Sequence, residues 1–169
     1  ELAQQRRITL IAQPIHQGFA AAVNRAVALH RDRDVVVLHA DAEVANDWLD
    51  RLSAHALERD IGAIAPMTNA YGTATYPIAN AVNPLPPGET VASLDALFAR
   101  ANDGESAGLP ALEGPCVYIR RECLAMVGAF DGGALGSDYA VVTDFCLRAA
   151  SAGFRHHLAG DVFVGEYGS

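Results

Sequence analysis

The segment from residue 34 to residue 44 constrains the fold of this chain more than any other. It reads Asp-Val-Val-Val-Leu-His-Ala-Asp-Ala-Glu-Val, so an apolar run ends at two acids separated by one residue. A short run of branched apolar residues is typical of a strand buried on both faces, which belongs in a parallel sheet covered by helices. Ligands bind at the carboxyl ends of the strands in such sheets, and paired carboxylates there suit a divalent cation that carries a phosphorylated substrate. We therefore expect the functional edge of the molecule where this strand ends.

Strand and helix patterns alternate along the rest of the chain. The periodicity predicts strands at 8–11, 35–39, 61–65, 115–119, 156–158 and 161–164. It predicts helices at 19–30, 120–127 and 141–152, and two more that begin near Asp47 and Ser93. Strand, helix, strand, helix and strand within the first part of the chain indicate an α/β fold with a mainly parallel sheet flanked by helices. With 51% hydrophobic residues, residues 1–169 are expected to form a single domain.

Composition excludes several classes of partner. The net charge of -8 argues against nucleic acid, because nonspecific binding to its phosphates needs clustered Lys and Arg. Cys116, Cys123 and Cys146 form no Cys-x-x-Cys pair, so we expect neither a zinc site nor a disulfide framework. No apolar run approaches the roughly 20 residues of a transmembrane helix, and residues 1–7 lack the hydrophobic segment typical of a signal peptide. A cytoplasmic protein without a transmembrane segment is expected.

The segment 66–88 carries five prolines and predicts a long loop. Loops of this length are often functional, and Tyr71 and Tyr76 could offer stacking surfaces for a ligand. The alternative is a solvated connection in which the two tyrosines are packed.

Asp41 and Glu43 alternate after the central apolar run. If the strand geometry continues, both carboxylates point the same way and share one Mg²⁺ or Mn²⁺. The alternative is that either acid caps the helix that follows.

Several separated blocks of the chain follow a known pattern in the same order. They are 17–25 with Gly-Phe-Ala and a later Asn, the acidic strand end and Trp-Leu helix of 34–49, the strand and Arg pair of 114–121, the Val-Gly-Ala-Phe-Asp of 127–131, and the helix of 144–154. Over nearly its whole length the chain resembles the family-2-like glycosyltransferases of the GT-A fold.

This resemblance implies transfer of a sugar from a nucleotide diphosphate donor to a glycan or other hydroxyl acceptor, with inversion and with Mn²⁺ or Mg²⁺ as cofactor. It places Asp41 at the metal-binding acid, and it implies that Asn24 and Asp41 help to bind the nucleotide sugar. His39 replaces the Asn or Asp usual two residues earlier, so Glu43 is expected to supply the second metal ligand.

Two departures from the pattern concern the catalytic residues. Val141 and Val142 stand where the family carries two acids, the second being the base, and valine cannot accept a proton. We expect Asp144 or Asp138 to replace that base. Glu166 stands where a His is usual, and its carboxylate can serve as a hard oxygen ligand of the metal.

The chain begins at the equivalent of the segment that follows the first strand, helix and strand of the family, so the domain is expected to be incomplete at its amino terminus. Three hypotheses follow: a metal-dependent glycosyltransferase, a catalytically degenerate GT-A-like binding or scaffold domain, and a phosphate-binding module unrelated to sugar transfer. An incomplete sheet would also expose an edge through which two copies could pair as a homo-oligomer.

Overall fold

The computed structural model describes residues 8–13, 15, 17–132 and 138–167, and of Asp138 and Tyr139 it describes the backbone alone. The helices are α1 (Phe19–Val27), α2 (Trp48–Ala54), α3 (Val91–Ala101), α4 (Arg121–Val127) and α5 (Asp138–Ser151). The strands are β1 (Val35–Leu38), β2 (Ala42–Glu43), β3 (Ile61–Thr68), β4 (Ser106–Leu109), β5 (Cys116–Ile119) and β6 (Arg155–Glu166). Among these helices, none combines the length and the hydropathy that crossing a membrane requires.

The strands form one sheet in the order β1-β5-β3-β6-β2, and β4 pairs with β6 beside this path. The expected α/β class, a sheet flanked by helices, is confirmed. The expectation of a mainly parallel sheet is wrong, because β3 and β6 are the one parallel pair among the described strands. The reason is that β5, from much later in the chain, lies between β1 and β3 and runs antiparallel to both.

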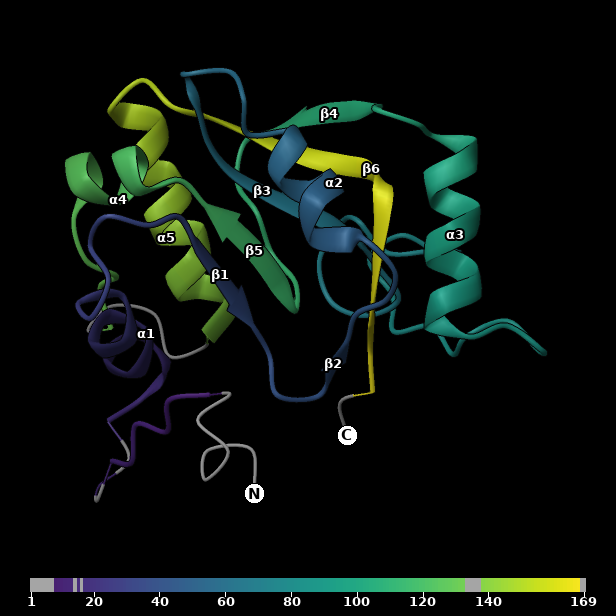
Figure 1. The fold of residues 1–169 in the computed structure, drawn as a ribbon, viewed down its shortest axis with the longest axis horizontal. Helices are drawn as coiled ribbons and strands as arrows, with labels where there is room; N and C mark the ends of the chain where they lie inside the picture. Colours follow the sequence, from purple (N-terminus) through teal and green to yellow (C-terminus); the bar gives the residue numbers. More distant parts are fainter. Residues whose placement is uncertain (1–7, 14, 16, 133–137, 168–169) are drawn as a thin grey trace.

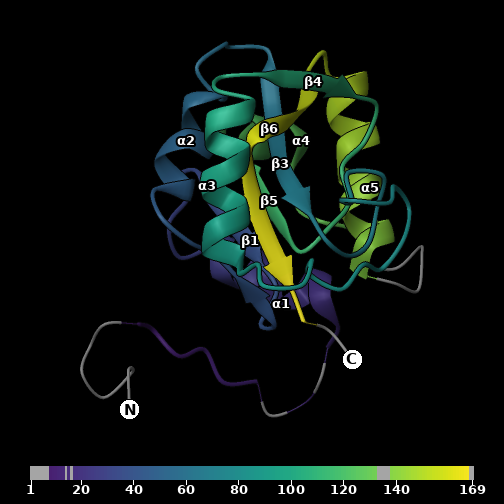
Figure 2. The ribbon, with the colours of Figure 1, turned by 90° about the vertical axis from the view of Figure 1, so that its right-hand side faces the viewer.

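Helices cover both faces of the sheet. Figure 2 shows the sheet between α2 and α3 on one side and α5 on the other. Side chains of β5 alternate between the two faces, as a pleated strand requires. Val117 and Ile119 join the core under α1, α4 and α5, whereas Cys116 and Tyr118 join the core under α2.

β1 lies at the edge of the sheet and is not buried on both faces as expected. Its valines are half-buried and Leu38 is exposed. Residues 8–11, expected to form a strand, have no strand pairing, and Ile8 and Leu10 are exposed. The apolar run therefore identifies a strand correctly but not its position in the sheet.

β6 is one strand where the sequence predicts two, and it bends in the middle. Its register with β3 jumps from Pro66 opposite Ala159 to Met67 opposite Phe163. Figure 1 shows the bend, which turns the last residues of β6 toward β2. Glu166 is thereby brought to the edge where β1 ends.

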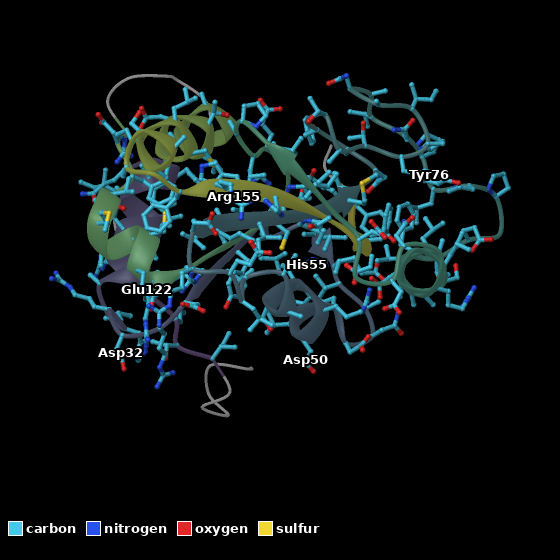
Figure 3. The ribbon with its side chains drawn as sticks, turned by 90° about the horizontal axis from the view of Figure 1, so that it is seen from above. Asp32, Asp50, His55, Tyr76, Glu122 and Arg155 are labelled. Carbon is cyan, nitrogen blue, oxygen red and sulfur yellow. The ribbon has the colours of Figure 1, made fainter. Side chains whose placement is uncertain are left out.

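A buried polar network joins α2 and α3 to β6. Arg51 Nη2 donates to the buried carboxylate of Asp95 at 2.6 Å, and the Phe163 amide donates to the same carboxylate at 3.0 Å. His55 lies between α2 and the sheet (Figure 3), with its Nε2 2.7 Å from the Asp161 carboxylate. Buried carboxylates are tolerated when paired in this way, so the network fixes β6 beneath two helices.

Candidate metal centre

The chain turns immediately after β1, through residues 39–42. The His39 amide donates to the Pro115 carbonyl at 2.8 Å, and the Ala42 amide donates back to the His39 carbonyl at 3.2 Å, which closes a four-residue turn. β2 then pairs antiparallel with the end of β6, with Ala42 opposite Glu166. Figure 1 shows β2 between the ends of β1 and β6.

This turn gathers three candidate ligands from two distant parts of the chain. One ligand atom each from His39, Asp41 and Glu166 lies within 4.8 Å of the other two. His39 Nδ1 is 3.2 Å from Glu166 Oε1. Glu166 is buried, Asp41 is exposed, and the ring of Phe19 meets His39 edge-on with centroids 6.2 Å apart.

The donor set fits a divalent cation. Two ligand atoms about 2.2 Å from one cation and at right angles to each other lie about 3.1 Å apart, close to the His39 to Glu166 separation. Two carboxylates suit Mn²⁺ and Mg²⁺ alike, whereas an imidazole ligand favours a transition metal over Mg²⁺. The cluster therefore fits Mn²⁺ best.

Glu43, expected as a metal ligand, lies outside this cluster. The strand geometry assumed for Asp41 and Glu43 ends at Leu38, and the turn that follows interrupts the alternation of side chains. The Tyr167 hydroxyl is hydrogen-bonded to Glu43, and partial burial together with this bond raises the pKa of that phenol.

Asn24, expected to help bind the nucleotide sugar, has its side chain engaged within the protein. Its Nδ2 donates to the Phe130 carbonyl at 2.8 Å and its Oδ1 accepts from the Phe130 amide at 2.9 Å. These two bonds tie α1 to the segment that leads toward α5.

The structure places the expected replacement bases on α5. Asp144 accepts a hydrogen bond from Arg148 Nε at 2.8 Å, and Arg148 also donates to the carbonyls of Val127 and Ala129. Asp138 begins α5, but its side chain lies outside the described residues. Val141 and Val142, at the positions of the expected acids, are buried in the core beside Ala20 and Phe145.

The proline-rich loop is ordered by its own polar side chains. Asn83 is buried and its Nδ2 donates to three backbone carbonyls. These carbonyls belong to Asn69, Ile78 and Ala81. Tyr76 packs edge-on against Phe98 with centroids 5.2 Å apart, whereas Tyr71 is exposed. Tyr76 is thus packed, as the alternative interpretation of the loop expects.

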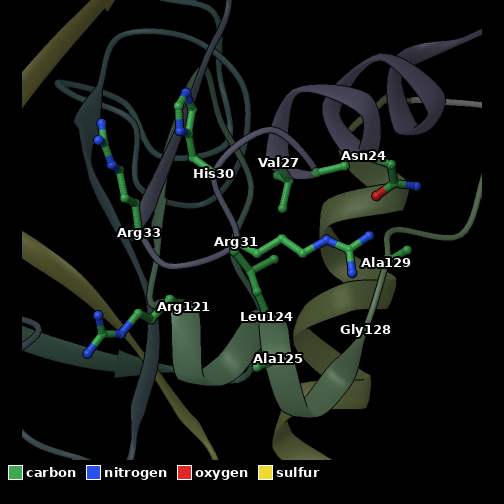
Figure 4. A pocket seen from close by; sticks show the side chains of 11 residues that line it. Asn24, Val27, His30, Arg31, Arg33, Arg121, Leu124, Ala125, Gly128 and Ala129 are labelled. Carbon is green, nitrogen blue, oxygen red and sulfur yellow. The ribbon is translucent and has the colours of Figure 1, made fainter.

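A cavity of about 460 Å³ lies between the end of α1 and α4, and three arginines line it. Figure 4 shows that Arg33 and Arg121 point away from the guanidinium of Arg31, so the cations do not converge on one ligand. The cavity adjoins the start of β1, at the other end of the strand from His39. It is separate from the candidate metal centre.

His39 was not expected as a ligand. It stands where the family resemblance implies an Asn or Asp, and Glu166 stands where the resemblance implies a His. The structure brings these two positions together, so the cluster has one imidazole and two carboxylates.

Comparison with known proteins identifies the family and the fold of the chain. Residues 1–125 match the family model described as Glycosyl transferase family 2. One similar solved structure is the mannosyltransferase PcManGT from Pyrobaculum calidifontis in complex with GDP-Man and Mn²⁺, with 20% identity and a TM-score of 0.61. Another is GalNAc-T7 with UDP, GalNAc and Mn²⁺, with 18% identity and a TM-score of 0.64. No curated protein matches the chain.

The two structural alignments include nearly all of this chain but less than half of each neighbour's chain. They span 97% and 98% of this chain, and 41% and 33% of the PcManGT and GalNAc-T7 chains respectively. At these identities the similarity establishes the GT-A fold.

Proposed function

Because this chain belongs to glycosyl transferase family 2, we propose that it binds a nucleotide diphosphate sugar with Mn²⁺ and transfers the sugar to a hydroxyl acceptor with inversion. The observation that carries the proposal is the convergence of His39, Asp41 and Glu166 at one edge of the sheet. Both structural neighbours were determined with Mn²⁺ and a nucleotide or nucleotide sugar, which supports the choice of ligands.

In this proposal the three residues hold the cation, which neutralises charge on the departing diphosphate. The acceptor oxygen attacks the anomeric carbon while the bond to the diphosphate breaks, and a carboxylate takes the acceptor proton. Asp144 or Asp138 is the proposed carboxylate. Arg148 Nε donates to Oδ2 of Asp144, so in this proposal Oδ1 takes the proton.

A second candidate function is donor binding without transfer. It is favoured by the burial of Val141 and Val142 and by the engagement of Asp144 with Arg148. In this case the chain is a binding or scaffold domain that keeps the cation site and has lost the base.

The first test is thermal unfolding with Mn²⁺ alone, with Mn²⁺ and UDP, and with Mn²⁺ and GDP-mannose. A ligand that binds only the folded state stabilises it by about 2.7 kcal/mol at 100 times its Kd, so a rise in Tm is expected.

Asp41→Asn and Glu166→Gln should each weaken Mn²⁺ binding by about 100-fold or more, since each removes a direct ligand. Glu43→Gln is the matched control and should keep the Mn²⁺ response. Absence of any Mn²⁺ effect on the wild type would contradict the proposal.

The second test separates the two candidate functions. Release of nucleotide diphosphate from a donor sugar is measured in the wild type and in Asp144→Asn, which should bind Mn²⁺ normally and turn over more slowly. Full turnover in Asp144→Asn would exclude it as the base. A wild type that binds Mn²⁺ and nucleotide but releases no product would favour the binding domain.

A further inference from the structure

The buried side chain of Asn69 fixes the backbone of Glu166. Asn69 Oδ1 accepts from the Glu166 amide at 2.7 Å, and Asn69 Nδ2 donates to the Glu166 carbonyl at 3.0 Å. Both backbone groups of the buried acid are thus satisfied by one side-chain amide.

This contact continues the sheet beyond the end of a strand. β3 pairs with β6 as far as Thr68 opposite Val164, and β3 ends there. The Asn69 side chain, which has the donor and acceptor of a peptide group, then takes the place of the next backbone partner of β6. Glu166 is therefore bounded on both edges of its strand. Asn69 binds its backbone on one edge, and β2 pairs with β6 along the other.

Asn69 also joins the metal centre to the proline-rich loop. Its Nδ2 donates to the Asn83 carbonyl at 3.0 Å, and its own carbonyl accepts from the Asn83 amide at 2.8 Å and from Asn83 Nδ2 at 3.3 Å. Asn69 and Asn83 are both buried, so these bonds are shielded from competing water.

We propose that Asn69 is a positioning residue of the metal centre, which sets the direction of the Glu166 side chain and couples cation affinity to the loop of residues 69–83. The proposal rests on the proposed function, since it requires a cation bound by the cluster. Residues that orient metal ligands typically change metal affinity by 10- to 100-fold when they are removed.

The chain supplies a matched control on the same strand. Asn102 Nδ2 donates to the Gly160 carbonyl at 2.8 Å, so it too binds the backbone of β6 through a side-chain amide. Gly160 lies six residues before Glu166 and on the other side of the bend, away from the cluster. Asn69→Ala and Asn102→Ala therefore remove the same kind of contact at two distances from the candidate ligands.

The experiment measures Mn²⁺ affinity by titration calorimetry and Tm without metal for both variants. Both should lower Tm, whereas only Asn69→Ala should weaken Mn²⁺ binding, by about tenfold. Equal Mn²⁺ affinity in Asn69→Ala and the wild type would overturn the proposal and leave the proposed function intact. A wild type that binds no Mn²⁺ would overturn both.

A double-mutant cycle tests whether Asn69 acts through Glu166. If it does, adding Asn69→Ala to Glu166→Gln should weaken Mn²⁺ binding no further. Independent, additive losses would overturn the positioning role.

Asn83→Ala tests the coupling to the loop, and it also serves if Asn69→Ala does not fold. It removes one bond to the Asn69 carbonyl and the side-chain bonds of Asn83 to Ile78 and Ala81, and it keeps the backbone groups of Asn83 that bind Asn69 and the bonds from Asn69 to Glu166. We expect a loss of Mn²⁺ affinity in the same direction but smaller than that of Asn69→Ala. An unchanged affinity would overturn the coupling.

Discussion

The sheet edge and helix α5 have opposite chemistry, although the family resemblance predicts acids in both. At the edge, His39, Asp41 and Glu166 converge, and both backbone groups of Glu166 are bonded to the Asn69 side chain while β2 pairs with β6 along the other edge. On α5, Val141 and Val142 are packed in the hydrophobic core. Cation binding thus has candidate ligands in place, whereas the usual position of the base is apolar.

The candidate cation ligands and the proposed base belong to separate structural elements. The candidate ligands are positioned by a turn after β1 and by the bent end of β6, through backbone hydrogen bonds in which α5 takes no part. An acid on α5 can therefore be lost without disturbing the edge. A chain of this kind can keep a donor site after it has lost transfer.

The largest expected effect comes from restoring an acid on α5. Val142→Asp should lower the free energy of unfolding by about 3 kcal/mol, because a carboxyl group would replace a side chain that is 4% exposed. Urea denaturation measures the loss, and Val142→Thr, which replaces one methyl group by a hydroxyl of similar size, should cost less. The same variant is assayed for release of nucleotide diphosphate. A Val142→Asp variant as stable as the wild type would show that this face of α5 reaches solvent. The conclusion that it is an apolar region, unlike the sheet edge, would then be wrong.

Local patterns in the sequence predicted most of the elements. Capping explains α3, where Thr90 and Ser93 bond each other's backbone amides, and Gly153 with φ of 95° ends α5 in the left-handed conformation that glycine favours. The candidate ligands also cluster at the end of the Val35–Leu38 strand, where the sequence predicts a cation site, and metal binding there stays a prediction. These features depend on residues that are close together in the chain.

Features that depend on distant residues were not predictable in this way. Strand alternation could not reveal that β5 lies between β1 and β3, because hydrophobic periodicity records burial and not strand order. Glu43 was favoured over His39 because the turn after Leu38 leaves no clear mark in the sequence. β4, whose residues 106–108 are exposed, carries no alternating pattern and was missed.

An intermediate effect is expected where α3 presses against the end of β6. A Cβ on Gly165 would lie 2.3 Å from Val91 Cγ2, so Gly165→Ala should lower stability by about 2 kcal/mol through overpacking. The displaced strand should also weaken Mn²⁺ binding at the neighbouring Glu166. Gly108→Ala on β4, where a Cβ would meet no atom within 4 Å, is the control and should be nearly neutral in both assays. Adding Val91→Ala to Gly165→Ala should restore part of the Mn²⁺ affinity; if it does not, steric contact is not the cause.

The smallest expected effect concerns His156, which joins the two regions. It lies on β6, its Nε2 donates to the Cys146 carbonyl of α5 at 2.9 Å, and its Nδ1 has no hydrogen-bond partner among the described residues. Burial lowers the pKa of His156 below the value of about 6.5 expected in an unfolded chain. The unfolded chain therefore takes up the proton first, so stability is full above about pH 6.5 and declines from there as the pH falls to the folded pKa. His156→Gln keeps an Nε2 donor that does not titrate, and it should flatten this decline in urea denaturation between pH 7.5 and 5. His157→Gln, at the adjacent and more exposed position, removes only a smaller Coulombic cause of the lowered pKa of His156 and should flatten the decline much less. A decline flattened as much as in His156→Gln would show that His156 is not the source of the pH dependence.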